Sequence, residues 1–170
     1  EWRQLVPHRL FGAGSLINRF VGTLPGLRRL SLRNYLIART APQEADKGLS
    51  VTILVPCRNE RGNIESAITR MPHFADDIEI LFVEGNSSDG TFEECERVRD
   101  TYAGHWDIKV VRQDGKGKGD AVRKGFDLAR GEVLMILDAD LTVPPEDLPK
   151  FYDALVAGKG EFVNGSRLVY

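Results

Sequence analysis

From residue 51 onward, short apolar runs alternate with segments of helical periodicity, and this alternation constrains the fold more than any other feature. The apolar runs, each predicted as a strand, are residues 51–56, 78–83, 108–112, 132–138 and 161–166. The segments between them predict helices at residues 62–71, 89–102, 120–130 and 145–157. Strands that are buried on both faces and alternate with helices are typical of parallel α/β sheets. The sequence therefore predicts an α/β fold with an open, mostly parallel, Rossmann-like sheet.

Unusual polar residues follow three of these predicted strands. The first strand runs into PCRNE (56–60), the second into EGNSSDGT (84–91) and the fourth into DADLT (138–142). Open α/β sheets bind ligands beyond the carboxyl ends of their strands, near a switch in strand order. A strand order of 3-2-1-4 brings these three ends side by side. We therefore expect one ligand-binding crevice at this edge.

Composition excludes several classes of protein. The formal net charge of the 170 residues is −2, which gives no reason to expect a nucleic-acid partner. The two cysteines, Cys57 and Cys95, form no CxxC motif, as is typical of a reduced, cytoplasmic chain rather than a disulfide scaffold. No apolar run approaches the ~18 residues of a membrane span. We expect a cytoplasmic location, either free or associated with the cytoplasmic face of a membrane.

The segment before residue 51 differs in charge from the rest. Residues 1–40 carry seven arginines and one acidic residue, with leucines between them. This pattern fits either a basic amphipathic segment on an anionic membrane surface or the tail of a preceding domain. Residues 41–50 are polar, contain Pro and Gly, and predict a linker to a domain at 51–170. Because the last residues resemble a strand, we expect that domain to be truncated at its C-terminal end.

Three motifs together resemble one known family. VTILVPCRNE is similar to a first strand with a Pro-x-x-Asn-Glu end, and ILFVEGNSSDGT to a second strand that usually ends in paired aspartates. GKGKGDAVRKGFDLARGEVLMILDADLTVPP is similar to a glycine-rich turn, a helix and an Asp-x-Asp strand. The family is the nucleotide-sugar-dependent glycosyltransferases of family 2, with the GT-A fold, and especially the polyprenyl-phosphate (dolichol-phosphate mannose type) synthases. The resemblance runs from Val51 to the end of the chain.

The resemblance implies a metal-dependent transfer of a sugar from a GDP- or UDP-linked donor to an acceptor. The acceptor it implies is a polyprenyl phosphate, with a glycan hydroxyl as the alternative, and the cofactor is Mg²⁺ or Mn²⁺. Asp138 and Asp140 are the implied catalytic and metal-binding pair. The implied donor-binding residues are Pro56, Arg58, Glu60, Val83, Glu84, Gly85, Lys118, Asp138, Ala139, Asp140, Thr142 and Arg167.

Physical chemistry supports this assignment for the fourth strand. Asp138 and Asp140 stand two residues apart, so both project from one side of an extended chain. Proteins hold Mg²⁺ with one or two carboxylates plus substrate phosphates, which two such side chains can supply. The turn at 114–120 offers backbone amides, Lys116 and Lys118 at a helix start, where anions bind readily.

Two departures from the family pattern leave the nucleotide base open. Glu84 is followed by Gly85, so one carboxylate of the usual pair is missing. Arg58 stands where a Tyr or another ring often occurs. Residues 1–40 lie outside the resemblance and are similar to the tail of a class I methyltransferase, as in a fusion protein.

Two other functions fit parts of the sequence. LMILDADLT also fits a haloacid dehalogenase-type phosphatase, with Asp138 as nucleophile and Asp140 as acid/base. That family places the motif after its first strand, whereas three strand–helix units precede it here, which favours the transferase. The remaining alternative is a non-catalytic nucleotide-binding module.

Overall fold

The computed structural model describes residues 2–4, 19–20, 33–35 and 48–165, and the chain divides into two compact units, 1–41 and 42–170. In the first unit, strand β1 (Trp2–Gln4) pairs antiparallel with β2 (Arg33–Tyr35). Strand β2 falls within the segment predicted as the tail of a preceding domain. Most of the predicted basic amphipathic segment and residues 41–47 of the predicted linker lie outside the described residues.

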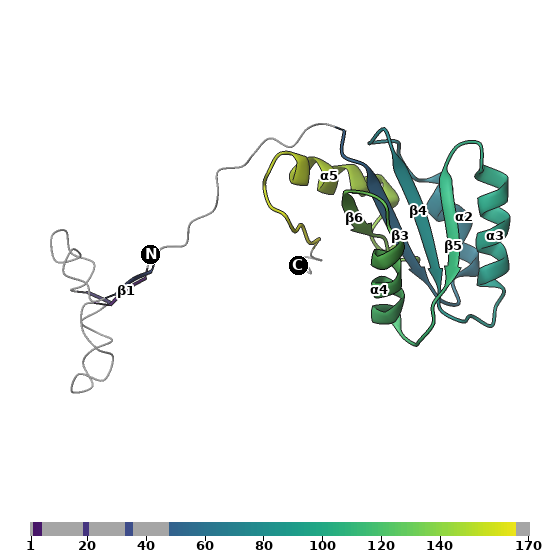
Figure 1. Ribbon diagram of the computed structural model, residues 1–170, viewed down its shortest axis with the longest axis horizontal. Helices are drawn as coiled ribbons and strands as arrows, with labels where there is room; N and C mark the ends of the chain where they lie inside the picture. Colours follow the sequence, from purple (N-terminus) through teal and green to yellow (C-terminus); the bar gives the residue numbers. More distant parts are fainter. Residues whose placement is uncertain (1, 5–18, 21–32, 36–47, 166–170) are drawn as a thin grey trace. The chain divides into compact units, whose positions relative to one another are not determined.

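The second unit contains the predicted parallel sheet (Figure 1). Its strands are β3 (Val51–Cys57), β4 (Ile78–Glu84), β5 (Asp107–Arg112) and β6 (Val133–Ile136). All neighbours pair in parallel, in the order β5-β4-β3-β6. This confirms the predicted order 3-2-1-4 and the Rossmann-like α/β class.

All four predicted helices are present, three of them between strands and the fourth after β6. They are α2 (Arg61–Thr69), α3 (Thr91–Tyr102), α4 (Lys118–Leu128) and α5 (Leu148–Val156), the last preceded by a 3₁₀ turn at Pro145–Asp147. Pro149 lies in the first turn of α5, where the N–H that proline lacks would have no intrahelical acceptor in any case.

The fifth predicted strand, 161–166, is wrong over the part that the structure describes. Residues 161–165 have no regular secondary structure, and Phe162 is 86% exposed. Strand formation depends on pairing and packing more than on residue type. Among the described residues, this apolar run has no neighbouring strand, and its sequence pattern alone does not form one.

The two faces of the sheet carry different helices. Residues such as Ile53 and Phe82 pack in one core with α2, α3 and α5, whereas Leu54 and Leu81 face α4 in a second, smaller core. Helix α4 lies close to the sheet because Gly125 has no side chain: a Cβ there would lie 2.2 Å from Leu54 Cδ1. This close approach brings the start of α4 over the carboxyl end of β3.

Candidate functional site

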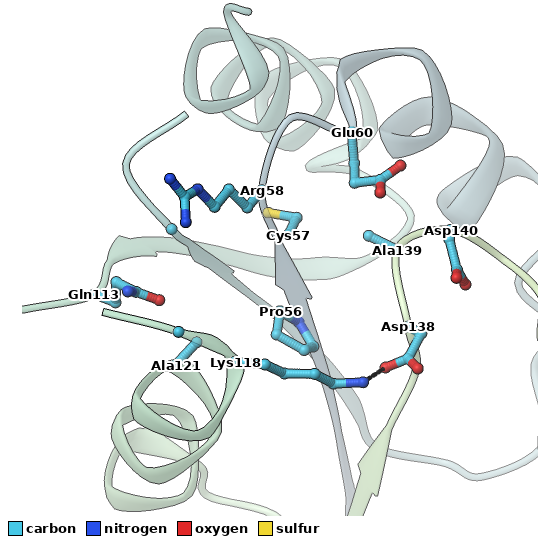
Figure 2. A pocket seen from close by; sticks show the side chains of 12 residues that line it. Pro56, Cys57, Arg58, Glu60, Gln113, Lys118, Ala121, Asp138, Ala139 and Asp140 are labelled. Atoms are coloured by element: carbon cyan, nitrogen blue, oxygen red, sulfur yellow. Dashed lines mark hydrogen bonds and ion pairs between the residues drawn. The ribbon is translucent and has the colours of Figure 1, made fainter. Parts of the chain in front are cut away.

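A pocket of about 280 Å³ lies at the carboxyl edge of the sheet (Figure 2). It collects residues from the ends of all four strands and from the start of α4. Its lining residues are Pro56, Cys57, Arg58, Glu60, Gly85, Gln113, Gly117, Lys118, Ala121, Asp138, Ala139 and Asp140. The crevice expected from the strand order is therefore present.

Hydrogen bonds between the loops after β3 and β4 hold one wall of the pocket. The amide of Asn59, at a left-handed φ of 55°, donates to Ser87 Oγ at 2.8 Å, and the amide of Glu60 donates to Thr91 Oγ1 at 2.9 Å. Asn tolerates this backbone region better than most residues. Because these two hydrogen bonds anchor the turn at Asn59 and Glu60, the side chains of Arg58 and Glu60 are held at the rim of the pocket.

A tight turn after β6 holds the opposite wall. The amide of Leu141 donates to Asp138 O at 2.9 Å, and Leu141 adopts a φ of 54°, which is uncommon for a bulky residue. Asp140 Oδ1 accepts hydrogen bonds from the amide and hydroxyl of Thr142, at 3.0 and 2.9 Å. The turn keeps both carboxylates at the pocket instead of letting the strand continue.

Lys118 connects α4 to this turn. Its Nζ forms an ion pair with Asp138 Oδ1 across the pocket, and the two side chains are 58% and 41% exposed (Figure 2). Gly117, before it, has a φ of 86°, which glycine adopts without strain. Asp120 closes the glycine-rich turn by accepting a hydrogen bond from the Gly115 amide at 2.8 Å.

Eight of the twelve predicted donor-binding residues line the pocket, and three of the other four are described but do not. Val83 is fully buried, and Glu84 is 1% exposed with its Oε1 accepting a 2.5 Å hydrogen bond from the Ser87 amide. Thr142 is exposed beside the pocket, where it holds Asp140. Arg167 lies outside the described residues. The roles predicted for these residues stay predictions.

Sequence reasoning missed Cys57, Gln113 and Ala121, whereas Gly117 belongs to the turn at 114–120 that was predicted to offer backbone amides. Gln113 follows β5 directly, so the rule that ligands bind at strand carboxyl ends would have found it, had the third strand been included. Cys57 lies with its Sγ 3.8 Å from Cys95 Sγ, and this hydrogen bond together with burial raises the pKa of the Cys57 thiol. The thiol therefore stays protonated at neutral pH and packs against Cys95 of α3 rather than serving as a nucleophile.

The carboxylates at the pocket fit a metal that arrives with a ligand. Among the described residues, no group of three or more His, Cys, Asp or Glu side chains is placed to hold a metal ion. Asp138 and Asp140 offer two carboxylates on one turn, which is a partial coordination shell. Mg²⁺ and Mn²⁺ prefer oxygen ligands, and Mg²⁺ commonly completes its shell with substrate phosphates and water. The donor set therefore fits either ion bound together with a diphosphate.

A parallel α/β sheet in the order 3-2-1-4, with an Asp-x-Asp turn at its carboxyl edge, defines the chain as a GT-A type domain. Residues 52–170 match the family described as Glycosyl transferase family 2, and the chain belongs to that family. The resemblance inferred from the three motifs is thereby confirmed. The methyltransferase resemblance of residues 1–40 gains no support, because the family match begins after that segment.

Two curated relatives are named dolichol-phosphate mannosyltransferase. The one from Saccharomyces cerevisiae is 36% identical over 112 residues, which is 63% of this chain and 41% of the relative. The one from Pyrococcus furiosus is 35% identical over 124 residues, covering 71% of this chain and 34% of the relative. The chain thus spans about two fifths or less of the length of these relatives.

A solved structure shares the fold. A mannosyltransferase from Pyrobaculum calidifontis, in complex with GDP-Man and Mn²⁺, superposes with a TM-score of 0.55 at 25% identity. The match covers 69% of this chain and 36% of that one. The fold also argues against the phosphatase alternative, whose Asp motif follows the first strand of its core. Here the motif follows β6, which is the last described strand of the sheet along the chain and pairs only with β3 among the described strands.

Proposed function

We propose that residues 51–170 form the donor-binding part of a metal-dependent glycosyltransferase, which moves a sugar from a nucleoside-diphosphate sugar to a polyprenyl phosphate. The observation that carries this proposal is the convergence of Asp138, Asp140 and Lys118 on one pocket at the carboxyl edge of the sheet. The names of the two relatives support a lipid-phosphate acceptor and mannose as the sugar. The GDP-Man in the solved structure supports a GDP-linked donor.

The chain's own residues divide the work at the pocket. Asp138 and Asp140 would hold the cation, which when bound neutralises charge on the departing diphosphate. Lys118 would donate a hydrogen bond to a phosphate oxygen from the start of α4, where helix amides also favour anions. One carboxylate oxygen of Glu60 accepts a hydrogen bond from Asn63 Nδ2 at 2.7 Å, which orients the group to accept one from a ribose hydroxyl.

The ionisation of the acceptor decides whether the site must supply a general base. The second pKa of a phosphomonoester is about 6, so a polyprenyl phosphate is already an anionic nucleophile near neutral pH and needs no general base. A glycan hydroxyl would need one.

Among the described residues, no helix is long and apolar enough to cross a membrane. We propose that the chain meets its lipid at the cytoplasmic membrane surface, because the seven arginines and one acidic residue of segment 1–40 suit anionic lipids.

Binding of nucleoside diphosphates tests the proposal. We expect GDP or UDP to bind in calorimetry with Mn²⁺ and to bind far more weakly with EDTA. At a hundred times its Kd, the ligand should stabilise the fold by roughly 2.7 kcal/mol. Asp140→Asn should remove the metal-dependent part of the binding. Asp127→Asn, on an exposed position of α4 outside the pocket, is the control and should bind as the unmodified chain does.

Two outcomes would contradict the proposal. The phosphatase alternative predicts that beryllium fluoride with Mg²⁺ forms an adduct on Asp138. That adduct, together with no binding of nucleotide and Mn²⁺, would overturn the transferase assignment. Assays of the full-length protein with a polyprenyl phosphate and with a glycan test the acceptor: transfer only to the glycan hydroxyl would overturn the lipid version.

A further inference from the structure

Gln113 is a buried polar residue at the pocket, on the opposite side from Asp138 (Figure 2). It is 7% exposed, and its amide donates to Glu84 O at 2.9 Å, continuing the β4–β5 ladder by one residue. Its side-chain Nε2 donates to Gly115 O at 2.9 Å. That bond fixes which end of the side-chain amide is nitrogen. Gln113 Oε1 is thus an acceptor that makes no hydrogen bond to any described residue.

The unpaired oxygen lies over Gly85. A Cβ at Gly85 would lie 3.4 Å from Gln113 Oε1, 3.4 Å from Cys57 O and 3.2 Å from Arg58 Cβ. By the motif resemblance, Gly85 stands where the second of the usual paired aspartates is expected. In this chain, the space into which that side chain would project is therefore bordered by the amide oxygen of Gln113. An acceptor oxygen therefore borders this space, but it belongs to a residue after a different strand, β5, and carries no charge.

The two ends of the pocket differ in chemistry. Asp138, Asp140 and Lys118 suit a cation and phosphates, whereas the other end presents the Gln113 oxygen beside the exposed guanidinium of Arg58. Glu84, nearby, is turned away to the Ser87 amide. A nucleoside diphosphate whose phosphates lie at the first end must extend its base toward the second.

An acceptor beside a cationic donor distinguishes between bases. Guanine and uracil each present a ring N–H next to a keto oxygen, which complements the Gln113 oxygen and the Arg58 guanidinium. Adenine and cytosine present an unprotonated ring nitrogen and an amino group at the same edge. Those groups would set acceptor against acceptor and donor against donor.

We propose that Gln113 is a specificity-determining residue, whose Oε1 accepts a hydrogen bond from the ring N–H of a keto base in place of the carboxylate absent at Gly85. This inference rests on the proposed function, since it names the base-reading group of the same donor site. It assigns Arg58 the role of donating to the keto oxygen.

The test compares nucleotides with a probe that has no base. Calorimetry on the full-length protein with Mn²⁺ measures GDP, UDP, ADP, CDP and inorganic pyrophosphate. For Gln113→Met, which keeps the side-chain length and removes the acceptor, we expect about tenfold weaker binding of the preferred keto nucleotide. Its preference over ADP and CDP should shrink by the same factor, and pyrophosphate should bind as before.

Gly85→Ala is the second variant, because Gln113→Met changes a buried residue. The added methyl group lies 3.4 Å from Gln113 Oε1 and should block the approach to it, with the same loss of preference. Gly62→Ala, where a Cβ meets nothing within 4 Å, is its matched control. Arg58→Ala should also lower the preference, and Arg123→Ala, an exposed arginine outside the pocket, should not.

The possible failures are distinguishable. If the unmodified protein binds neither nucleotides nor pyrophosphate with Mn²⁺, the proposed function itself is wrong. If it binds them, and folded Gln113→Met and Gly85→Ala keep both the affinity and the preference for the keto base, only the role of Gln113 is overturned. Equal weakening of every ligand, pyrophosphate included, would also overturn it, because a base-reading group cannot act on a ligand without a base.

Discussion

The two edges of the parallel sheet use polar side chains in opposite ways. At the amino edge, Glu79 is fully buried and both of its oxygens are bonded within the chain. At the carboxyl edge, the Gln113 oxygen has no partner among the described residues, and Asp138 and Lys118 pair across an open pocket. The same kinds of groups therefore stabilise one edge and remain available to a ligand at the other.

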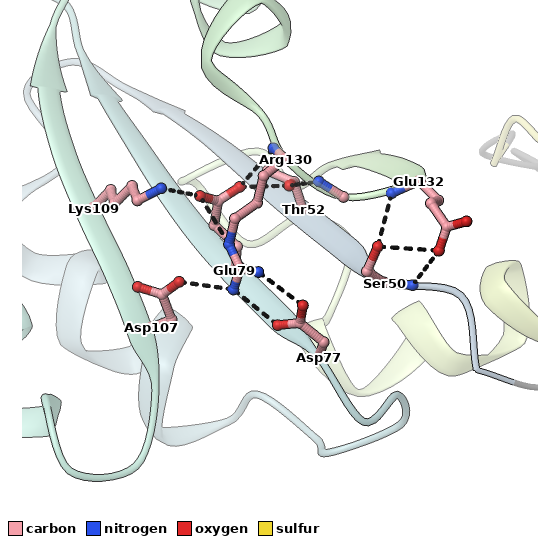
Figure 3. A network of polar contacts seen from close by, with 9 residues as sticks. Ser50, Thr52, Asp77, Glu79, Asp107, Lys109, Arg130 and Glu132 are labelled. Atoms are coloured by element: carbon pink, nitrogen blue, oxygen red, sulfur yellow. Dashed lines mark hydrogen bonds and ion pairs between the residues drawn. The ribbon is translucent and has the colours of Figure 1, made fainter.

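The amino edge is a closed network of hydrogen bonds (Figure 3). Glu79 accepts from Lys109 Nζ and Thr52 Oγ1, both at 2.6 Å, and from the Arg130 amide at 3.1 Å. Thr52 Oγ1 in turn accepts from the Gly131 amide at 2.9 Å. Burial by itself would raise the pKa of Glu79, but these bonds outweigh it and hold the pKa below its ordinary value.

Arg130 ties the network to three elements. Its guanidinium donates to Asp77 at 2.7 and 2.8 Å and to Asp107 at 2.8 Å, joining the starts of β4 and β5 to the turn between α4 and β6. This turn fixes the residue at which β6 begins, with Val133 opposite Val51. The amino edge therefore sets the register of the strand that presents Asp138 at the other edge.

The largest expected effect is at Glu79. Glu79→Ala leaves Thr52 Oγ1 and the Arg130 amide without their acceptor, so the free energy of unfolding should fall by about 3 kcal/mol. Urea unfolding measures this change. Asp76→Ala, an exposed neighbouring acid, is the control and should change stability by less than about 0.5 kcal/mol. If Glu79→Ala lowers the free energy of unfolding by less than about 1 kcal/mol, the amino edge does not depend on this carboxylate for folding, and the contrast between the two edges is wrong.

A smaller loss is expected at Gly131, where the backbone of the turn touches β3. In Gly131→Ala, the added Cβ would lie 2.4 Å from Thr52 N and 2.6 Å from Val51 C, so the turn must shift. The free energy of unfolding should therefore fall by about 2 kcal/mol. Gly104→Ala is the matched control because a Cβ there meets nothing within 4 Å. Equal thermal unfolding of the two variants would show that the turn is not held against β3.

Sequence patterns predicted the fold well because burial in a parallel sheet demands strands that are apolar on both faces, such as residues 53–55 of β3. They failed at 161–166, where the pattern resembled a strand but pairing was required. At the site, motifs predicted Asp138 and Asp140 because both come from one short segment. Gln113 was missed because the end of the third predicted strand was not considered. Its position beside Gly85, 28 positions earlier along the chain, is a tertiary feature that no local pattern encodes.

The pH dependence of stability should reveal the charge on Glu79. Because its pKa is lowered in the folded chain, the ionised group stabilises the fold above its ordinary value of 4.5, and this contribution is lost as the pH falls. Glu79→Gln should therefore be less stable than the unmodified chain by about 1.5 kcal/mol at pH 7. The difference should narrow below pH 4.5. A difference that stays constant from pH 7 to pH 3 would show that shape, not charge, matters there.

The smallest change in stability is expected for Asp140→Asn, although the metal-dependent part of nucleotide binding should be lost completely. Asp140 is exposed, and an Asn at this position keeps an oxygen that can accept the hydrogen bonds from Thr142, so stability should stay within about 0.5 kcal/mol. Removing one of two close carboxylates also relieves repulsion, which opposes any loss. Urea unfolding without metal tests this, with Asp127→Asn as control. If Asp140→Asn lowers the free energy of unfolding by more than about 1 kcal/mol, a partner inside the chain has been left unsatisfied. The carboxyl edge would then use the Asp140 carboxylate for folding, as the amino edge uses Glu79.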